Sequence, residues 1–249
     1  MPVPTAITQL RLANGLYADA VEGLMVPGDA PVQQLAARFG AFGYLQVEGI
    51  IALGQSEVAL QLQVAQLVRS LDEAWAQVAW LVAPDDENIK LRRAIGLERE
   101  SLQEHRAKLV YSQTHTNTQA AQHLAELATR EAQLAGMIEA HGVEGPPSLR
   151  DIMEGLGRPD RYVIYRWDSD AVHSSLTGLG YLVDHTLDEV VELGNGGDVG
   201  GRLARIVAAW DIAGDLYEIV ADELGFALAG WAEQHQQSTE TLEALYAEI

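Results

Sequence analysis

Apolar residues recur three and four positions apart through almost the whole chain, and no stretch of useful length alternates apolar with polar residues. Helical spacing is typical of amphipathic α-helices, whereas a half-buried strand needs strict alternation. The pattern therefore predicts an all-α fold, a multi-helix bundle of about seven to nine helices. Helices are expected over residues 5–26, 31–53, 56–82, 87–113, 119–140, 148–156, 160–183, 202–224 (or to 235) and 239–249.

The 249 residues are enough for one large domain or two small ones. The clearest linker is H-G-V-E-G-P-P at 141–147, which marks a possible internal boundary. We nevertheless predict a single helical domain over 1–249, because polar groups on the two sides of this linker have complementary chemistry. Acidic helices within 202–249 would complete the bundle.

The net charge of −20 is unevenly distributed, since residues 184–249 hold two basic and 14 acidic residues. Nucleic-acid binders normally show a basic surface, because phosphate contacts dominate their affinity. A nucleic-acid role here requires a local basic patch, and 11 of the 16 basic residues lie in 85–183. The basic-leaning segment 86–108 could line a phosphate groove or form a solvated helix with internal ion pairs.

The acidic C-terminal region could bind a protein or another cationic partner. Its carboxylates alternate with apolar residues at helical spacing, which predicts an amphipathic element with a solvated acidic face. The residues expected on that face are Asp211, Asp215, Asp222 and Glu223.

No apolar run approaches the ~20 residues that a membrane span requires, and the first residues do not resemble a secretory signal. We therefore expect a cytoplasmic protein with no membrane partner. The chain has no cysteine, which excludes disulfides and thiolate metal sites. Its histidines lack ligand spacing with carboxylates, and no Glu-x-x-His pair is present. Neither a metal nor another cofactor is expected.

The nine residues Y-R-W-D-S-D-A-V-H at 165–173 place several polar groups within an otherwise apolar helix. Residues three, four and seven apart share one helix face, so many of these groups form a single stripe. Such a stripe needs a polar partner or a wet cleft, because an unpaired buried polar group costs about 1–3 kcal/mol. The stripe comprises Tyr162, Arg166, Ser169, Asp170 and His173.

A partner for this stripe is available on the helix expected over 56–82. Arg69 and Glu73 lie four residues apart there, on an otherwise apolar helix. If the two helices pack together, Glu73 could neutralise Arg166 or orient His173 in a charge-assisted network. Alternatively, Arg69 and Glu73 form only an intrahelical ion pair.

The chain resembles a family of uncharacterised bacterial helical proteins in three successive motifs. These are R-S-L-x-E-A-x-A-x-x-A-W-L-V at 69–82, R-R-A-I-x-L-x-R-E-S-L at 92–102, and Y-R-x-x-S-x-x-x-H at 165–173. The resemblance covers about residues 30–185.

The spacing of Arg166 and His173 also resembles the R-x(4–6)-H signature of the HEPN superfamily. That resemblance implies a HEPN-like helical core with extra N- and C-terminal helices, often as a homodimer. Many HEPN proteins are metal-independent ribonucleases of toxin, RNA-processing or phage-defence systems. The position after the arginine is usually polar in active members; here it is Trp167, and Asp168 could supply the polar group.

The resemblance implies roles for the two residues. His173 would act as general base or acid, and Arg166 would bind the scissile phosphate of an RNA substrate. RNA needs no metal in this reaction, because its 2′-hydroxyl group supplies an internal nucleophile. Six residues would support the pair: Arg69, Glu73, Tyr162, Asp168, Ser169 and Asp170.

A second interpretation belongs to a different class. The chain could be a non-enzymatic acidic scaffold or interaction module, in which the Arg–Ser–His stripe is a structural network covered by Trp75 or Trp80. The strong negative charge favours this interpretation, because it repels RNA and suits a protein partner.

Overall fold

The computed structural model describes residues 2–28, 30–54, 61–115, 120–172 and 199–247. All regular secondary structure in these ranges is helical, which confirms the predicted all-α bundle. No helix in these ranges is both long and apolar enough to cross a membrane. The helices are α1 (Pro2–Val21), α2 (Pro31–Gly54), α3 (Gln61–Val82), α4 (Glu87–His115), α5 (Ala120–His141), α6 (Leu149–Gly155), α7 (Pro159–Val172), α10 (Val199–Leu224) and α11 (Trp231–Ala247).

Two helix boundaries differ from the predictions by several residues. Helix α1 ends at Val21 instead of residue 26, and Gly23 follows with a φ of 77°. A glycine in this left-handed conformation is a common helix terminator. Helix α11 begins at Trp231, before the predicted start at 239. The helix expected over 160–183 is described as far as Val172, and its remainder lies outside the described residues.

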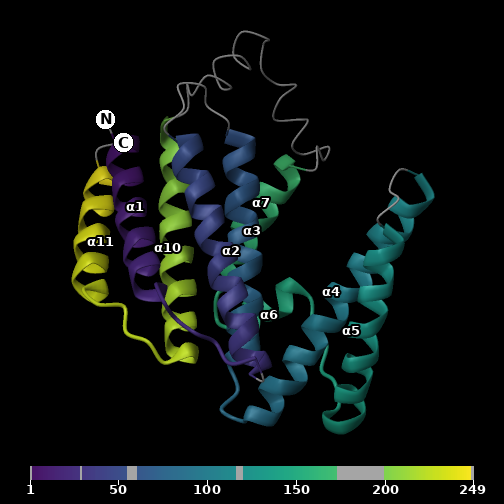
Figure 1. Cartoon of the computed structure of the whole chain (residues 1–249). Coiled ribbons are helices and arrows are strands. Elements are labelled where there is room, and N and C mark those ends of the chain that lie inside the picture. The colour runs from purple at the N-terminus through teal and green to yellow at the C-terminus, as the bar shows by residue number, and fades with distance from the viewer. Residues whose placement is uncertain (1, 29, 55–60, 116–119, 173–198, 248–249) are drawn as a thin grey trace.

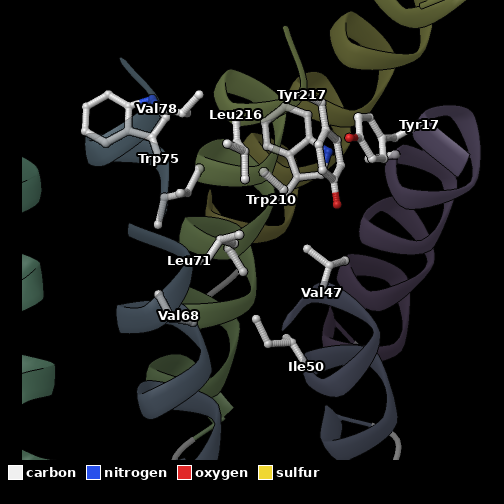
Figure 2. Close-up of a cluster of buried hydrophobic side chains, with 14 of the residues drawn as sticks. Tyr17, Val47, Ile50, Val68, Leu71, Trp75, Val78, Trp210, Leu216 and Tyr217 are labelled. Carbon is white, nitrogen blue, oxygen red and sulfur yellow. The ribbon is translucent and has the colours of Figure 1, made fainter. Parts of the chain in front are cut away.

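Helix α10 lies at the centre of the bundle. It packs against α1, α2 and α3, and Figure 1 shows it in green between α1 and α2. Figure 2 shows Leu216 of α10 near Leu71 of α3, and all of Leu71, Leu216 and Val47 are fully buried. This apolar core accounts for the helical spacing of the sequence.

A polar network crosses the same core. The rings of Tyr17 and Tyr217 stack with their centroids 4.0 Å apart. The hydroxyl group of Tyr217 donates a hydrogen bond to Asn14 Oδ1 (2.5 Å), and Asn14 Nδ2 donates to Glu48 Oε1 (2.6 Å). Burial raises the pKa of Tyr17 to about 12. The network ties α1, α2 and α10 together through groups that would be costly to bury alone.

Helices α4 and α5 form a hairpin that extends away from the bundle (Figure 1). The hairpin has its own apolar cluster, with Ile95 and Leu102 from α4 and Leu127 and Leu134 from α5. Val110 and Tyr111 of α4 lie outside this cluster and are exposed.

Ion pairs occupy most of the basic residues of α4, in agreement with the solvated-helix interpretation. Two of them reach outside the hairpin helices: Lys90 Nζ lies 3.0 Å from Glu223 of α10, and Arg93 Nε lies 2.8 Å from Glu144. The expectation that Glu223 is solvated was therefore wrong, because the carboxylate of Glu223 is buried against Lys90. The other pairs are Lys90–Glu87, Arg106–Glu131 and Lys108–Glu104.

Candidate functional site

Helix α7 carries the polar stretch identified in the sequence, and it packs against α3. The short helix α6 precedes it, capped by Ser148, whose hydroxyl group accepts a hydrogen bond from the amide of Asp151. Helix α7 then begins at Pro159, a first-turn position where the missing amide proton is not needed. The packing of this helix on the helix of Arg69 and Glu73, which the sequence suggested, is confirmed.

Tyr165 makes the polar contact between the two helices. Its hydroxyl group donates a 2.8 Å hydrogen bond to Glu73 Oε1, and Arg69 Nη2 lies 3.1 Å from the same oxygen. The guanidinium group of Arg69 also lies over the Tyr165 ring, 5.1 Å from its centroid. We call these three residues the Tyr165 clasp. The intrahelical ion pair is therefore real, but it is also part of an interhelical contact.

The clasp has a defined protonation state. Burial raises the pKa of Tyr165, and the neighbouring carboxylate of Glu73 raises it further. The phenol therefore stays protonated near neutral pH and acts as the donor to Glu73. A hydrogen bond to an ionised acceptor is stronger than one between neutral groups, so the clasp fixes the position of α7 on α3.

Tyr162 and Arg166 flank the clasp on α7. Tyr162 is partly buried against the main core, and its ring lies 6.1 Å from that of Tyr165. Arg166 is exposed. The stripe expected from residue spacing therefore divides, in its described part, into a half-buried tyrosine and an exposed arginine.

The remaining predicted residues are described less fully or not at all. Asp168, Ser169 and Asp170 belong to the last turns of α7, where the structure describes the backbone only. His173 lies outside the described residues. The proximity of Arg166 and His173 stays a prediction.

A second polar cluster, which was not predicted from the sequence, joins α7 to α10. Arg161 Nη2 donates hydrogen bonds to Asp211 Oδ2 (2.6 Å) and Asp215 Oδ2 (2.7 Å). Arg158 donates to the same two carboxylates at 3.3 and 3.0 Å. We call these four residues the arginine–aspartate cluster. The face predicted to be solvated is so only in part: the side chains of Asp211 and Asp215 are 48% and 33% exposed, but both carboxylates also bind α7 and the residue just before it.

Trp75 of α3 covers this cluster. The guanidinium carbon of Arg161 lies 4.1 Å from the centroid of the Trp75 ring, and that of Arg158 lies 5.9 Å away. Arg161 is only 2% exposed. The ring and the two aspartates replace part of its hydration, and in the described part of the chain its Nε and Nη1 atoms are buried without a hydrogen bond. The scaffold interpretation placed Trp75 or Trp80 over the Arg–Ser–His stripe. In the structure Trp75 lies over Arg158 and Arg161, and Trp80 lies over Arg93.

A signal for this cluster exists in the sequence. Arg158 and Arg161 are three residues apart, and Asp211 and Asp215 are four apart, so each pair shares one helical face or turn. Opposite charges that each lie within one helical turn, on two separate segments, are compatible with ion pairing. Nothing in the local sequence, however, specifies which acidic face meets which basic face.

Together, the clasp and the cluster anchor α7 to α3 and α10. Arg166 is the next residue after Tyr165, so its backbone is held while its side chain is exposed. An arginine side chain on a fixed backbone can bind a phosphate or carboxylate group. Among the described residues, no three His, Cys, Asp or Glu side chains are grouped so that they could hold a metal ion.

No curated protein and no solved structure matches the chain. A family model does match, over residues 42–190, and its description is "Family of unknown function (DUF5677)". The match includes α3 to α7, and with them the Tyr165 clasp and the segment from Arg166 to His173. Because it spans more than half of the sequence, the chain belongs to the DUF5677 family.

Proposed function

We propose that the chain is a HEPN-like, metal-independent RNA endonuclease of the toxin or phage-defence type, with Arg166 and His173 as its catalytic residues. The observation that carries the proposal is the exposure of Arg166 next to the Tyr165 clasp. A phosphate-binding arginine must be accessible to a polynucleotide, and its backbone must be positioned before the substrate arrives. In support of the proposal, Arg166 is an exposed residue, and it directly follows Tyr165, whose hydroxyl group is bonded to Glu73.

In the proposed reaction, His173 removes the proton from a ribose 2′-hydroxyl group. The 2′-oxygen forms a bond to the adjacent phosphorus atom, and the bond to the 5′-oxygen of the next nucleotide breaks. The leaving oxygen takes up a proton, and the products are a 2′,3′-cyclic phosphate and a 5′-hydroxyl end. Arg166 stabilises the negative charge that develops on the phosphate oxygens.

The test uses a fluorescent, unstructured RNA in buffer containing a chelator. We expect the wild-type protein to cleave it and to leave 2′,3′-cyclic phosphate ends. The variants His173→Ala and Arg166→Gln should each lose about 100-fold or more of the cleavage rate, the usual size of a general-base or oxyanion contribution. An otherwise identical RNA with 2′-O-methyl groups should resist cleavage.

His105→Ala is the matched control, because His105 is an exposed histidine of α4 with no proposed role. It should retain the wild-type rate. Wild-type protein that does not cleave RNA under these conditions, or cleavage that survives in His173→Ala, contradicts the proposal.

A homodimer belongs to the same proposal, since two copies would bring two Arg–His pairs into one cleft. A cytoplasmic location is expected with it. Light scattering of the purified protein should give twice the 27.0 kDa chain mass. A monomeric mass at micromolar concentration would contradict the shared cleft and leave each pair to act alone.

A second candidate function is a non-enzymatic interaction scaffold. The observation in its favour is that Arg158, Arg161, Lys90 and Arg93 are all neutralised by carboxylates of the chain. Paired cations add little attraction for a polyanion, and the net charge of −20 opposes it. Inactivity of the wild-type protein on RNA, together with a large loss of thermal stability in Arg166→Gln, would support this candidate.

A further inference from the structure

Two arginines of α4 stand apart from the ion pairs that surround them. Arg92 and Arg99 are seven residues apart and share one face of the helix, separated by about 10 Å along its axis. Both are partly buried. In the described part of the chain neither has a carboxylate or other hydrogen-bond acceptor for its side chain, and the Nε atom of each is buried without a hydrogen bond.

The segment 142–145 lies against this face of α4. The amide of Glu144 donates a 3.0 Å hydrogen bond to the carbonyl oxygen of Arg92. Gly96 lies between the two arginines, and a Cβ atom there would overlap the carbonyl oxygen of Glu144. The linker is therefore docked on the helix, and the glycine permits the close approach.

The arginine side chains lie beside glycines of the same segment. A Cβ atom at Gly142 would lie 3.5 Å from Arg92 Cδ, and one at Gly145 would lie 3.4 Å from Arg99 Nη2. Glu144 is the one acidic residue of segment 142–145, and it pairs with Arg93 instead. Its Oε1 atom lies 2.8 Å from Arg93 Nε. Arg92 and Arg99 are thus left next to main chain without a charged partner among the described residues.

An unpaired, partly buried guanidinium group is costly, because a buried N–H group without an acceptor loses its hydration. The chain carries 36 acidic residues, yet none of those described pairs with these two arginines. Two unpaired guanidinium groups on one helix face indicate a binding site for an external anion. Two guanidinium charges balance a dianionic group, and the fork of N–H donors matches phosphate oxygens.

We propose that Arg92 and Arg99, with the main chain of 142–145 as one wall, form a binding site for a phosphate group. The site is independent of the proposed nuclease activity and uses none of its residues. Its ligand is either a free phosphate compound or the terminal phosphate of an RNA strand, and both present the same chemistry to the arginines. Glu100 opposes binding, since its Oε1 lies 3.8 Å from where a Cβ of Gly145 would be.

The test measures binding of inorganic phosphate to the full-length protein by isothermal titration calorimetry. A 2′-O-methyl RNA decamer, with and without a 5′-phosphate, is titrated in parallel. Arg92→Gln and Arg99→Gln should each weaken phosphate binding about tenfold or more, because each removes charge-assisted hydrogen bonds. Glu100→Gln should strengthen it. Tighter binding of the phosphorylated decamer than of the hydroxyl form identifies an RNA end as the source, and equal binding identifies a free phosphate compound.

Arg106→Gln is the matched control, because it removes the same charge from the same helix at an exposed ion pair with Glu131. It should change the affinity less than about twofold, since exposed charges at this separation are screened. Circular dichroism establishes that each variant is folded. Should either glutamine variant fail to fold, Arg92→Lys or Arg99→Lys replaces it and should still weaken binding, because lysine keeps the charge but lacks the fork of N–H donors that matches phosphate oxygens. Absence of phosphate binding by the wild type, or equal weakening in Arg106→Gln, overturns the proposal.

Discussion

The hydroxyl group of Tyr165 donates a 2.8 Å hydrogen bond to Glu73, across 92 residues of sequence. This bond joins α7 to α3 immediately before Arg166. Because Arg69 also binds Glu73, the carboxylate is shared between a partner on its own helix and one on α7. The clasp therefore makes the position of Arg166 depend on two residues of α3.

A double-mutant cycle measures this contact. Tyr165→Phe and Glu73→Gln should each lower the free energy of unfolding by about 1 kcal/mol, since a hydrogen bond to a carboxylate is removed at a partly exposed site. The double variant should lose less than the sum, with a coupling of about 0.5–1.5 kcal/mol measured by urea denaturation. Strict additivity would contradict the bond.

Substitutions in the arginine–aspartate cluster should also be non-additive, but here the double variant should lose more free energy of unfolding than the sum of the single variants. Arg161 Nη2 is bonded to both Asp211 and Asp215, so either carboxylate alone still neutralises it. Asp211→Asn or Asp215→Asn should cost about 1 kcal/mol each, whereas the double variant should cost about 3–5 kcal/mol because a buried charge is left unpaired.

Asp222→Asn serves as the control for this series. Asp222 is an exposed residue of α10, so its substitution should change the free energy of unfolding by no more than about 0.5 kcal/mol. A double variant that loses only about 2 kcal/mol would mean that Trp75 and water are sufficient partners for Arg161.

The helical architecture was predictable because it depends on local information. Apolar residues recur at helical spacing within each helix, and proline and glycine interrupt this pattern between helices. The observed helix starts at Pro31 and Glu87 agree with the predicted ones. The early end of α1 depends on Gly23, a residue that the apolar pattern alone did not mark as a terminator.

The candidate site was only partly predictable, because its contacts join distant segments. Spacing correctly brought α7 to the helix of Glu73, but it assigned that carboxylate to Arg166 or His173, and the structure shows Tyr165 as a partner. A stripe defined by spacing does not specify how the helix is rotated about its axis. For the same reason Asp211 and Asp215 were expected in solvent, although Arg161 was already present in the sequence to pair with them.

The docked linker makes a prediction about Gly96. Gly96→Ala should destabilise the protein by about 1–3 kcal/mol, because the added methyl group overlaps the carbonyl oxygen of Glu144 and backbone must move. Gly136→Ala in α5 is the control, since a Cβ there meets no atom within 4 Å. It should stabilise the protein by about 0.5–1 kcal/mol through helix propensity. Thermal or urea unfolding checks both signs, and stabilisation by both substitutions would refute the docking of the linker on α4.

The stability of the protein should fall steeply at alkaline pH because of Tyr17. Burial raises its pKa from 10.0 to about 12, so the unfolded chain ionises first as the pH rises. The contribution of Tyr17 is complete below pH 10 and is lost as the pH rises through 12, with a loss of about 1.4 kcal/mol by pH 11. The pKa of Tyr217 is also raised by burial, so Tyr217 acts in the same direction.

Tyr17→Phe should therefore make the free energy of unfolding less dependent on pH between 9 and 11. Tyr111→Phe is the control: it replaces a residue that is 69% exposed and should leave the slope unchanged. Equal slopes for the wild type and Tyr17→Phe would mean that the phenol is hydrated in the folded protein, and the stack with Tyr217 would then not be closed to water.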